Sequence, residues 1–281
     1  LHLSVHSFPT RRSSDLDQDA PPVSAVREVR ATGDALLNAR SLTRSASGRP
    51  VTRLRVEGPE MRFINTPQAG VERFDVLGRG SMQVEDYRPA PARPTRAADA
   101  GRDTPERPVD AFTGRGVTLL LWNDGLTLDA ADNDLLATGG IALLHRPDPG
   151  RGSAVDAPPS PDEDVFQLDA QRLTVDLIET GGLGVWLGDA PPQPEVRAID
   201  AERDVRVVRG DKTIYADAMA YRRADDAIRF TGDPDSTTGD RFVRIEQIGQ
   251  PRTPRARAVL YHLTEDRLQA FDVVGGTGVA R

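Results

Sequence analysis

The clearest pattern in the chain is the alternation of apolar and polar residues between positions 205 and 232. Apolar residues occupy every second position in four short runs, Val205/Val207, Ile214/Ala216, Met219/Tyr221 and Ile228/Phe230. A period of two predicts β-strands. Gly210-Asp211 and Asp225-Asp226 separate the runs and predict turns. The alternation shifts by one residue between Ala216 and Met219, which predicts a β-bulge near Asp217.

Short patterns from this stretch recur elsewhere in the chain. The pattern apolar-x-Ala-polar-x-apolar begins at Leu37, Leu168 and Ile214, with an incomplete copy at Ala256. A second pattern, apolar-x-apolar-x-Gly, ends at Gly58, Gly139 and Gly232. A tyrosine precedes an aspartate by five positions at Tyr221/Asp226 and at Tyr261/Asp266. Repeats of this kind are typical of stacked units, none of which buries its apolar face alone.

Similar alternation predicts an all-β fold for most of the chain. The predicted strands outside 205–232 lie at 35–42, 51–56, 61–64, 73–77, 81–87, 116–122, 126–130, 135–137, 141–145, 165–177 and 185–187. Glycine and proline between these runs, as at Gly58-Pro59, predict turns.

Composition divides the chain into blocks. Residues 1–22 do not share the pattern and are interpreted as a disordered or artefactual leader. A first β block covers 23–88, a proline-rich linker covers 89–110, and a second β block covers 111–281. Loop insertions are expected in the second block at 146–164 and 189–195.

The overall composition narrows the classes of function. The chain has 281 residues, of which 38% are hydrophobic, and it contains 25 Gly and 22 Pro, which favours many short strands with long loops. There are no cysteines, so disulfides and thiol chemistry are excluded. A net charge of −7 argues against a nucleic-acid partner. Only Lys212 among the 36 basic residues is a lysine.

No motif for catalysis or metal binding emerges. The four histidines do not have the spacing of metal ligands. The acidic stretch 129–134 lacks the glycine and glutamate of a calcium loop, so we interpret it as the turn of a hairpin. We therefore expect no catalytic residue, no metal and no cofactor, and we predict that the protein is not an enzyme.

The recurring pattern resembles the OstA-like superfamily, which includes LptA, LptC and the N-terminal domain of LptD in lipopolysaccharide transport. The best matches are 213–232 and 255–272, with weaker ones at 36–58 and 165–177. The resemblance implies a β-taco or β-jellyroll of two facing antiparallel sheets, in one or two units.

The resemblance also implies a function and a place. It implies a periplasmic, lipid-binding scaffold for outer membrane biogenesis, which carries lipopolysaccharide or a related glycolipid with its acyl chains in an open apolar groove. Expected partners are other β-jellyroll proteins of this kind, joined by edge-to-edge strand pairing, and a head-to-tail oligomer is possible. The residues expected to line the groove are Leu54, Val56, Leu119, Leu121, Ile214, Ala216, Ala218, Ile228 and Phe230.

Two other functions stay open at this point. One is a structural or adhesive β-repeat protein without a ligand, for which a sealed interior would argue. The other is a carbohydrate-active β-solenoid enzyme, for which two converging carboxylates in a cleft would argue.

Overall fold

A computed structural model confirms the all-β prediction. It describes residues 2–4, 28–40, 52–66, 71–87, 116–147, 165–178, 195–225, 227–233, 242–249, 255–263 and 265–274. Fifteen strands in these ranges form one sheet, and each strand pairs antiparallel with its neighbours except β1, which runs parallel to β2. No helix among the described residues is long and apolar enough to cross a membrane. The predicted strand at 185–187 lies outside the described residues.

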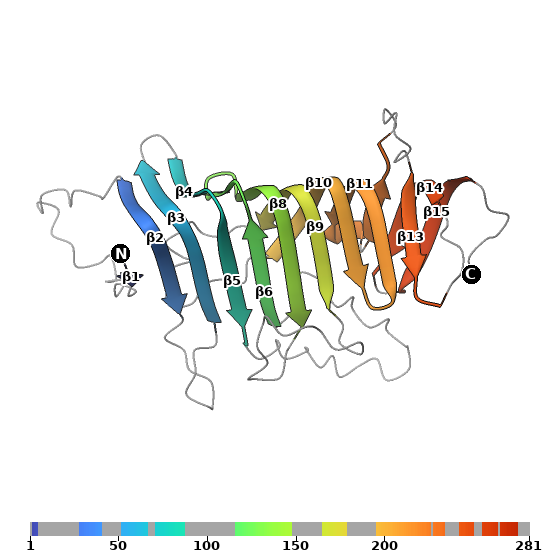
Figure 1. Cartoon of the computed structure of the whole chain (residues 1–281), viewed down its shortest axis with the longest axis horizontal. Coiled ribbons are helices and arrows are strands. Elements are labelled where there is room, and N and C mark those ends of the chain that lie inside the picture. Colours follow the sequence, from blue (N-terminus) through green and yellow to red (C-terminus); the bar gives the residue numbers. More distant parts are fainter. Residues whose placement is uncertain are drawn as a thin grey trace, which may run out of the picture.

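The strands follow one another along the sheet almost in sequence order (Figure 1). They are β1 (His2–Ser4), β2 (Glu28–Arg40), β3 (Thr52–Thr66), β4 (Val71–Leu77), β5 (Gly80–Asp86), β6 (Gly116–Trp122), β7 (Gly125–Asp129), β8 (Asp134–Pro147), β9 (Phe166–Ile178), β10 (Glu195–Arg209), β11 (Lys212–Arg222), β12 (Ala227–Thr231), β13 (Val243–Gln247), β14 (Arg255–His262) and β15 (Arg267–Val274). A single 3₁₀ turn, Arg223–Asp225, links β11 to β12.

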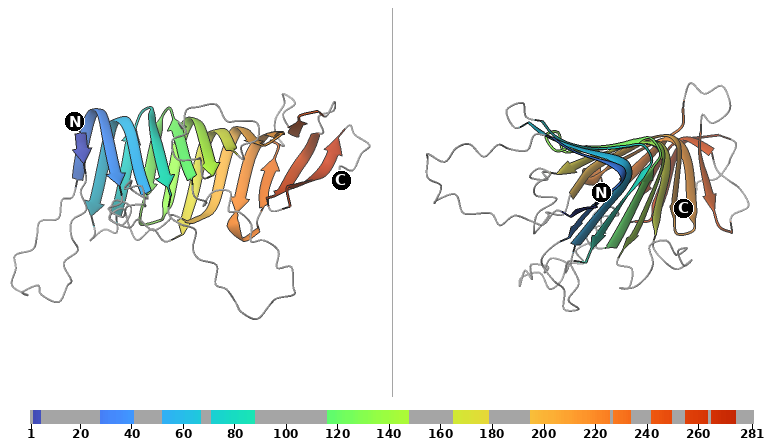
Figure 2. Two further views of the ribbon diagram at one scale, coloured as in Figure 1. Left: turned by 90° about the horizontal axis from the view of Figure 1, so that it is seen from below. Right: turned by 60° about the vertical axis from the view of Figure 1, so that its left-hand side comes forward.

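The sheet is folded along its length into two arms, because its long strands bend near their middle. One half of β3 pairs with β4 and the other half pairs with β5, so β4 and β5 act together as one bent strand. The end-on view in Figure 2 shows the two arms meeting in a V. The first arm contains 28–32, 60–66, 71–77, 125–129, 134–138, 172–178, 195–202, 218–222, 227–231, 258–262 and 267–271. The second arm contains 35–40, 52–57, 80–86, 116–122, 141–147, 166–170, 205–209, 212–216, 243–247, 255–256 and 273–274.

The bend, which we name the ridge, is made by bulges on alternate strands. At the ridge, β2, β8 and β10 each have one residue more than the strand they pair with. Two consecutive residues with positive φ lie there in each of the three strands. These pairs are Gly33-Asp34, Gly139-Gly140 and Arg203-Asp204. A bulge bends its strand and increases the local twist. The bulge predicted near Asp217 lies on the neighbouring strand, because β10 carries the extra residue opposite Asp217.

The ridge explains the first recurring pattern in β9 and β11 and the second pattern in β3 and β8, whereas the copy that begins at Leu37 lies within the second arm. In β9 and β11 the pattern places two apolar residues on the second arm, then a polar residue at the ridge, then an apolar residue on the first arm. The ridge residues are Gln171 and Asp217, each opposite a bulge on the adjacent strand. Gly58 and Gly139, which close the second pattern, also lie at the ridge. The apparent phase shift in the sequence is therefore the passage of a strand from one arm to the other.

Glycines at the ridge allow close packing between neighbouring strands. A Cβ atom on Gly58 would lie 2.3 Å from Cγ1 of Val76, and one on Gly139 would lie 2.2 Å from Cγ of Asp124. The prediction of a turn at Gly58-Pro59 was wrong, because β3 continues through these residues in the same direction. A glycine between two alternating runs suits a bend inside a strand as well as it suits a reversal.

The two predicted β blocks are parts of one sheet. The proline-rich segment 89–110 lies outside the described residues, but β5 and β6 on either side of it pair directly through seven residue pairs. β4 and β7 pair in the same way.

Candidate functional site

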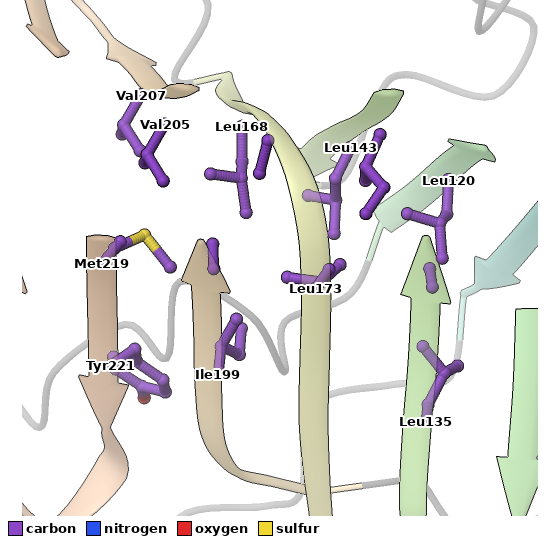
Figure 3. Close-up of a cluster of buried hydrophobic side chains, with 14 of the residues drawn as sticks. Leu120, Leu135, Leu143, Leu168, Leu173, Ile199, Val205, Val207, Met219 and Tyr221 are labelled. Carbon is purple, nitrogen blue, oxygen red and sulfur yellow. The ribbon is translucent and has the colours of Figure 1, made fainter. Parts of the chain in front are cut away.

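The inner faces of the two arms form one apolar cluster that extends along the molecule. Figure 3 shows its central part, with side chains from β6, β8, β9, β10 and β11. The second arm contributes residues such as Leu168 and Val207, and the first arm contributes Leu173, Ile199 and Met219. Each fully buried aliphatic side chain of this size contributes about 1.5–3 kcal/mol to folding. We name the space between the arms, which this cluster fills, the interior.

Six of the nine residues expected to line the groove lie on the inner faces. Val56, Ile214, Ile228 and Phe230 are buried in the cluster, and Leu54 and Ala216 are partly buried against it. Ile228 and Phe230 have no exposed surface at all. The sequence therefore identified the inner face correctly on β3, on the first half of β11 and on β12.

Leu119, Leu121 and Ala218 do not lie in the interior, so their prediction was wrong. Leu120 and Trp122 belong to the apolar cluster, which places Leu119 and Leu121 on the outer face of β6. Leu121 is 40% exposed. Ala218 follows the ridge on β11, where Met219 and Tyr221 point inward instead.

Burial of the interior differs between the two ends of the sheet. Near the N-terminal end, buried inner residues such as Val56 and Val76 are accompanied by five apolar side chains that are only partly buried against the cluster, namely Leu37, Leu54, Phe63, Phe74 and Met82. Near the C-terminal end the larger inner residues of β11 to β14 are buried completely or almost completely, whereas Ala216 is partly buried; the buried residues are Ile214, Met219, Tyr221, Ile228, Phe230, Val243, Val259 and Tyr261. Most of the partly buried side chains that pack against the cluster therefore lie in the first strands of the sheet.

Charged groups meet across the interior at the C-terminal end. Lys212 begins β11 at the free end of the second arm, in phase with the buried Ile214. Its Nζ atom lies 2.8 Å from Oδ2 of Asp266, which follows the free end of the first arm. The Lys212 side chain is only 14% exposed, whereas that of Asp266 is 61% exposed. Lys212 therefore reaches from the inside of one arm to the rim of the other.

A second contact across the interior lies beside the first. The guanidinium of Arg209, in phase with Val205 and Val207 on the second arm, lies 5.8 Å from the ring centroid of Tyr261 on the first arm. This distance is within the range of a cation–π interaction. The Tyr261 hydroxyl donates a hydrogen bond to Oδ1 of Asp266. The two contacts therefore share one network.

The network shifts the ionisation of its members. Burial alone would raise the pKa of Asp266, but hydrogen bonds from Lys212 and Tyr261 and the charges of Lys212 and Arg209 outweigh it, so that pKa is lowered. Burial would likewise lower the pKa of Lys212, but its bonds to Asp266 and Asp211 outweigh burial, so that pKa is raised. A hydrogen bond from Gln247 is the main cause of the lowered pKa of Asp211. All three groups are therefore charged at neutral pH.

The arginines of β10 and β12 differ in their surroundings. Arg206 lies on the outer face, where its Nη1 donates to Oδ2 of Asp169 on β9 at 2.8 Å. Arg229 is exposed on the outer face of β12. Arg209 alone of these three is directed toward the interior.

Carboxylates of the described residues serve structural roles at turns and on the outer face. Oδ1 of Asp129 accepts hydrogen bonds from the backbone N–H groups of Ala131 and Asp132, as expected for the turn of the β7–β8 hairpin. No group of three or more potential metal ligands is present among the described residues.

The network of Lys212, Arg209, Tyr261 and Asp266 was not identified from the sequence, although two signals pointed to it. Lys212 is the single lysine of the chain, and the Tyr-x4-Asp spacing recurs. The structure explains this spacing at Tyr261, since its hydroxyl bonds the aspartate of the following turn.

The chain matches no protein-family model, and no curated protein matches it.

Proposed function

We propose that this protein is a non-enzymatic, periplasmic, lipid-binding scaffold that holds the acyl chains of lipopolysaccharide or a similar glycolipid between its two arms. The observation that carries the proposal is that one apolar cluster extends along the sheet and that several of its larger side chains in the first strands are only partly buried. These strands expose part of their inner apolar surface, at Leu54, Phe63, Phe74 and Met82. Acyl chains that displace water from this surface would gain about 0.8 kcal/mol for each buried CH₂ group.

The V shape suits a ligand that must be released again. Two arms joined along one ridge carry one apolar cluster from β2 to β14. An acyl chain inserted between the arms would therefore contact apolar side chains along the whole sheet, once the arms separate over its closed strands. Transfer of an acyl chain between neighbouring positions of similar affinity needs little free energy. Release of the same chain from a closed cavity would cost the whole free energy of its burial.

The last strand supports a partner that adds to the sheet. Among the described residues β15 pairs with β14, and its Phe271, Val273 and Val274 are exposed. An exposed strand edge with apolar side chains favours pairing with a strand of another chain. We include such β-jellyroll partners, and head-to-tail copies of this chain, in the proposal.

Photo-crosslinking tests the proposal directly. Benzoylphenylalanine at Phe74, on the inner face, should give an adduct with radiolabelled lipopolysaccharide. The same residue at Leu121, on the outer face of β6 and also apolar, is the matched control. Equal labelling at both positions, or none at Phe74, would reject the carrier.

The complete burial near Ile228 and Phe230 favours one alternative, a structural β-repeat protein without a ligand. The same experiment separates the two functions. The structural protein predicts no adduct at Phe74, although the protein remains folded.

A further inference from the structure

The contacts between the two arms at the C-terminal end differ in kind from the ion pairs on the outer face of the described strands. Pairs such as Arg30–Glu60 and Arg222–Asp200 join neighbouring strands of one arm on its outer face. Lys212 and Asp266 are 54 positions apart and belong to opposite arms. Arg209 and Tyr261 likewise connect opposite arms.

We propose that Arg209, Lys212, Tyr261 and Asp266 form a clasp that holds the two arms together at their free ends over β10 to β15, and that the interior behind it opens when the clasp is released. The inference rests on the proposed function for its purpose, since acyl chains could pass the last strands only with the clasp open. Its geometry does not depend on that function.

The position of the clasp explains what it would control. Lys212 lies five residues from the ridge residue Asp217 on β11, at the end of the arm. Tyr261 lies at the corresponding end of β14, opposite Ile228. The completely buried side chains of Phe230 and Val259 therefore lie between the clasp and the ridge, and Ile228 is buried beside Tyr261, behind the Lys212–Asp266 pair. A link at the free ends of two hinged arms has the greatest leverage over their separation.

The chemistry of the clasp suits a reversible link. Lys212 also lies 3.3 Å from Oδ1 of Asp211, which accepts a hydrogen bond from Gln247 in turn. When Asp266 moves away, Asp211 on the same arm remains as a partner for the ammonium group. Breaking a buried ion pair is expensive because it leaves one charge without a partner. Asp211 reduces this cost for Lys212.

Thiol labelling tests the clasp without any lipid, and the absence of native cysteines makes the signal specific. A cysteine replaces Ile228, behind the clasp, or Leu173, in the central part of the interior. Both native side chains are fully buried. Each cysteine is combined with the clasp variant Arg209→Met/Lys212→Met, which keeps the aliphatic stems. The matched control Arg197→Met/Arg222→Met removes two charges from outer-face pairs with Asp176 and Asp200.

We expect maleimide to label the cysteine at position 228 about tenfold faster in the clasp variant, because an ion pair and a cation–π contact together contribute about 1.4 kcal/mol. Labelling at position 173 should not change, and the control variant should leave both rates unchanged. No acceleration at 228, an equal acceleration at both positions, or an equal effect of the control variant would overturn the clasp. If the labelling rate at position 228 does not rise but a lipid adduct forms at Phe74, the clasp is wrong and the lipid carrier stands. If the labelling rate rises but no adduct forms at Phe74, the carrier is wrong and the clasp stands.

Discussion

The first and last strands of the sheet share one architecture but differ in how their inner faces are closed. In β2 to β5 aromatic and aliphatic side chains such as Phe63, Phe74 and Met82 are partly buried. In β11 to β14 their counterparts are completely buried, and charged side chains join the two arms in front of them. The same alternating pattern therefore produces larger inner side chains that are partly buried at one end and completely buried at the other.

This difference shows that the alternation fixes which side chains face inward, but not how completely each of them is buried. At the C-terminal end, contacts between the arms are made by residues at the free ends of the strands. Lys212 and Asp266 are such residues. Three changes would sharpen or remove the contrast between the two ends.

The largest effect is expected from removing a phenylalanine at the closed end. Phe230→Ala should lower the free energy of unfolding by about 3–5 kcal/mol, because it leaves a cavity among fully buried neighbours. Phe74→Ala, at the accessible end, should cost about half as much, because part of the ring is already in water. Urea denaturation followed by circular dichroism measures both. Equal losses would show that the two ends are packed alike.

A smaller effect is expected at the ridge. Gly139→Ala should destabilise the protein by about 1–3 kcal/mol, since φ is +80° and the exposed Asp124 side chain must rotate away from the new Cβ. Gly33→Ala should cost about 1 kcal/mol, because φ is +77° but no atom lies within 4 Å of the added Cβ. Thermal unfolding of the two variants compares the bulges. A ridge that tolerated Gly139→Ala as well as Gly33→Ala would contradict the packing described.

The smallest effect is expected from the clasp charge. Lys212→Met should destabilise the protein by about 1 kcal/mol or less at neutral pH, as for other partly exposed ion pairs. The lowered pKa of Asp266 implies a contribution that is present above the ordinary value of 3.8 and lost as the pH falls through the folded value. The raised pKa of Lys212 implies a contribution that is present below 10.5 and lost at higher pH.

Urea titrations of the wild type and of Lys212→Met at several pH values test this dependence. The difference in stability should be constant near neutrality and shrink as the pH falls from 3.8 through the lower pKa of Asp266 in the folded protein. Arg222→Met, which changes an outer-face pair of the first arm, serves as the control for the lost charge. A difference that persisted in acid would show that Lys212 acts through packing and not through Asp266.

Much of the interior was predictable from single strands. Ile228 and Phe230 flank the exposed Arg229, so their shared face follows from the period of two. β6 gave no such information, because Leu119, Leu120 and Leu121 are consecutive apolar residues. Cross-strand pairing of Leu120 with Met82 and Leu143 decided which of them face inward. The error at Leu119 and Leu121 therefore has a physical cause.

By itself, the sequence determined that the chain is all β, which faces of most strands are apolar, and that similar units repeat. These properties depend on residues two to five positions apart, so they are local. Only the tertiary structure decided that Gly58 and Gly139 bend a strand instead of reversing it, because this depends on which strand pairs with the segment that follows. It also decided that Lys212 meets Asp266, since the folding of the sheet along the ridge brings together the free ends of strands that are distant in sequence.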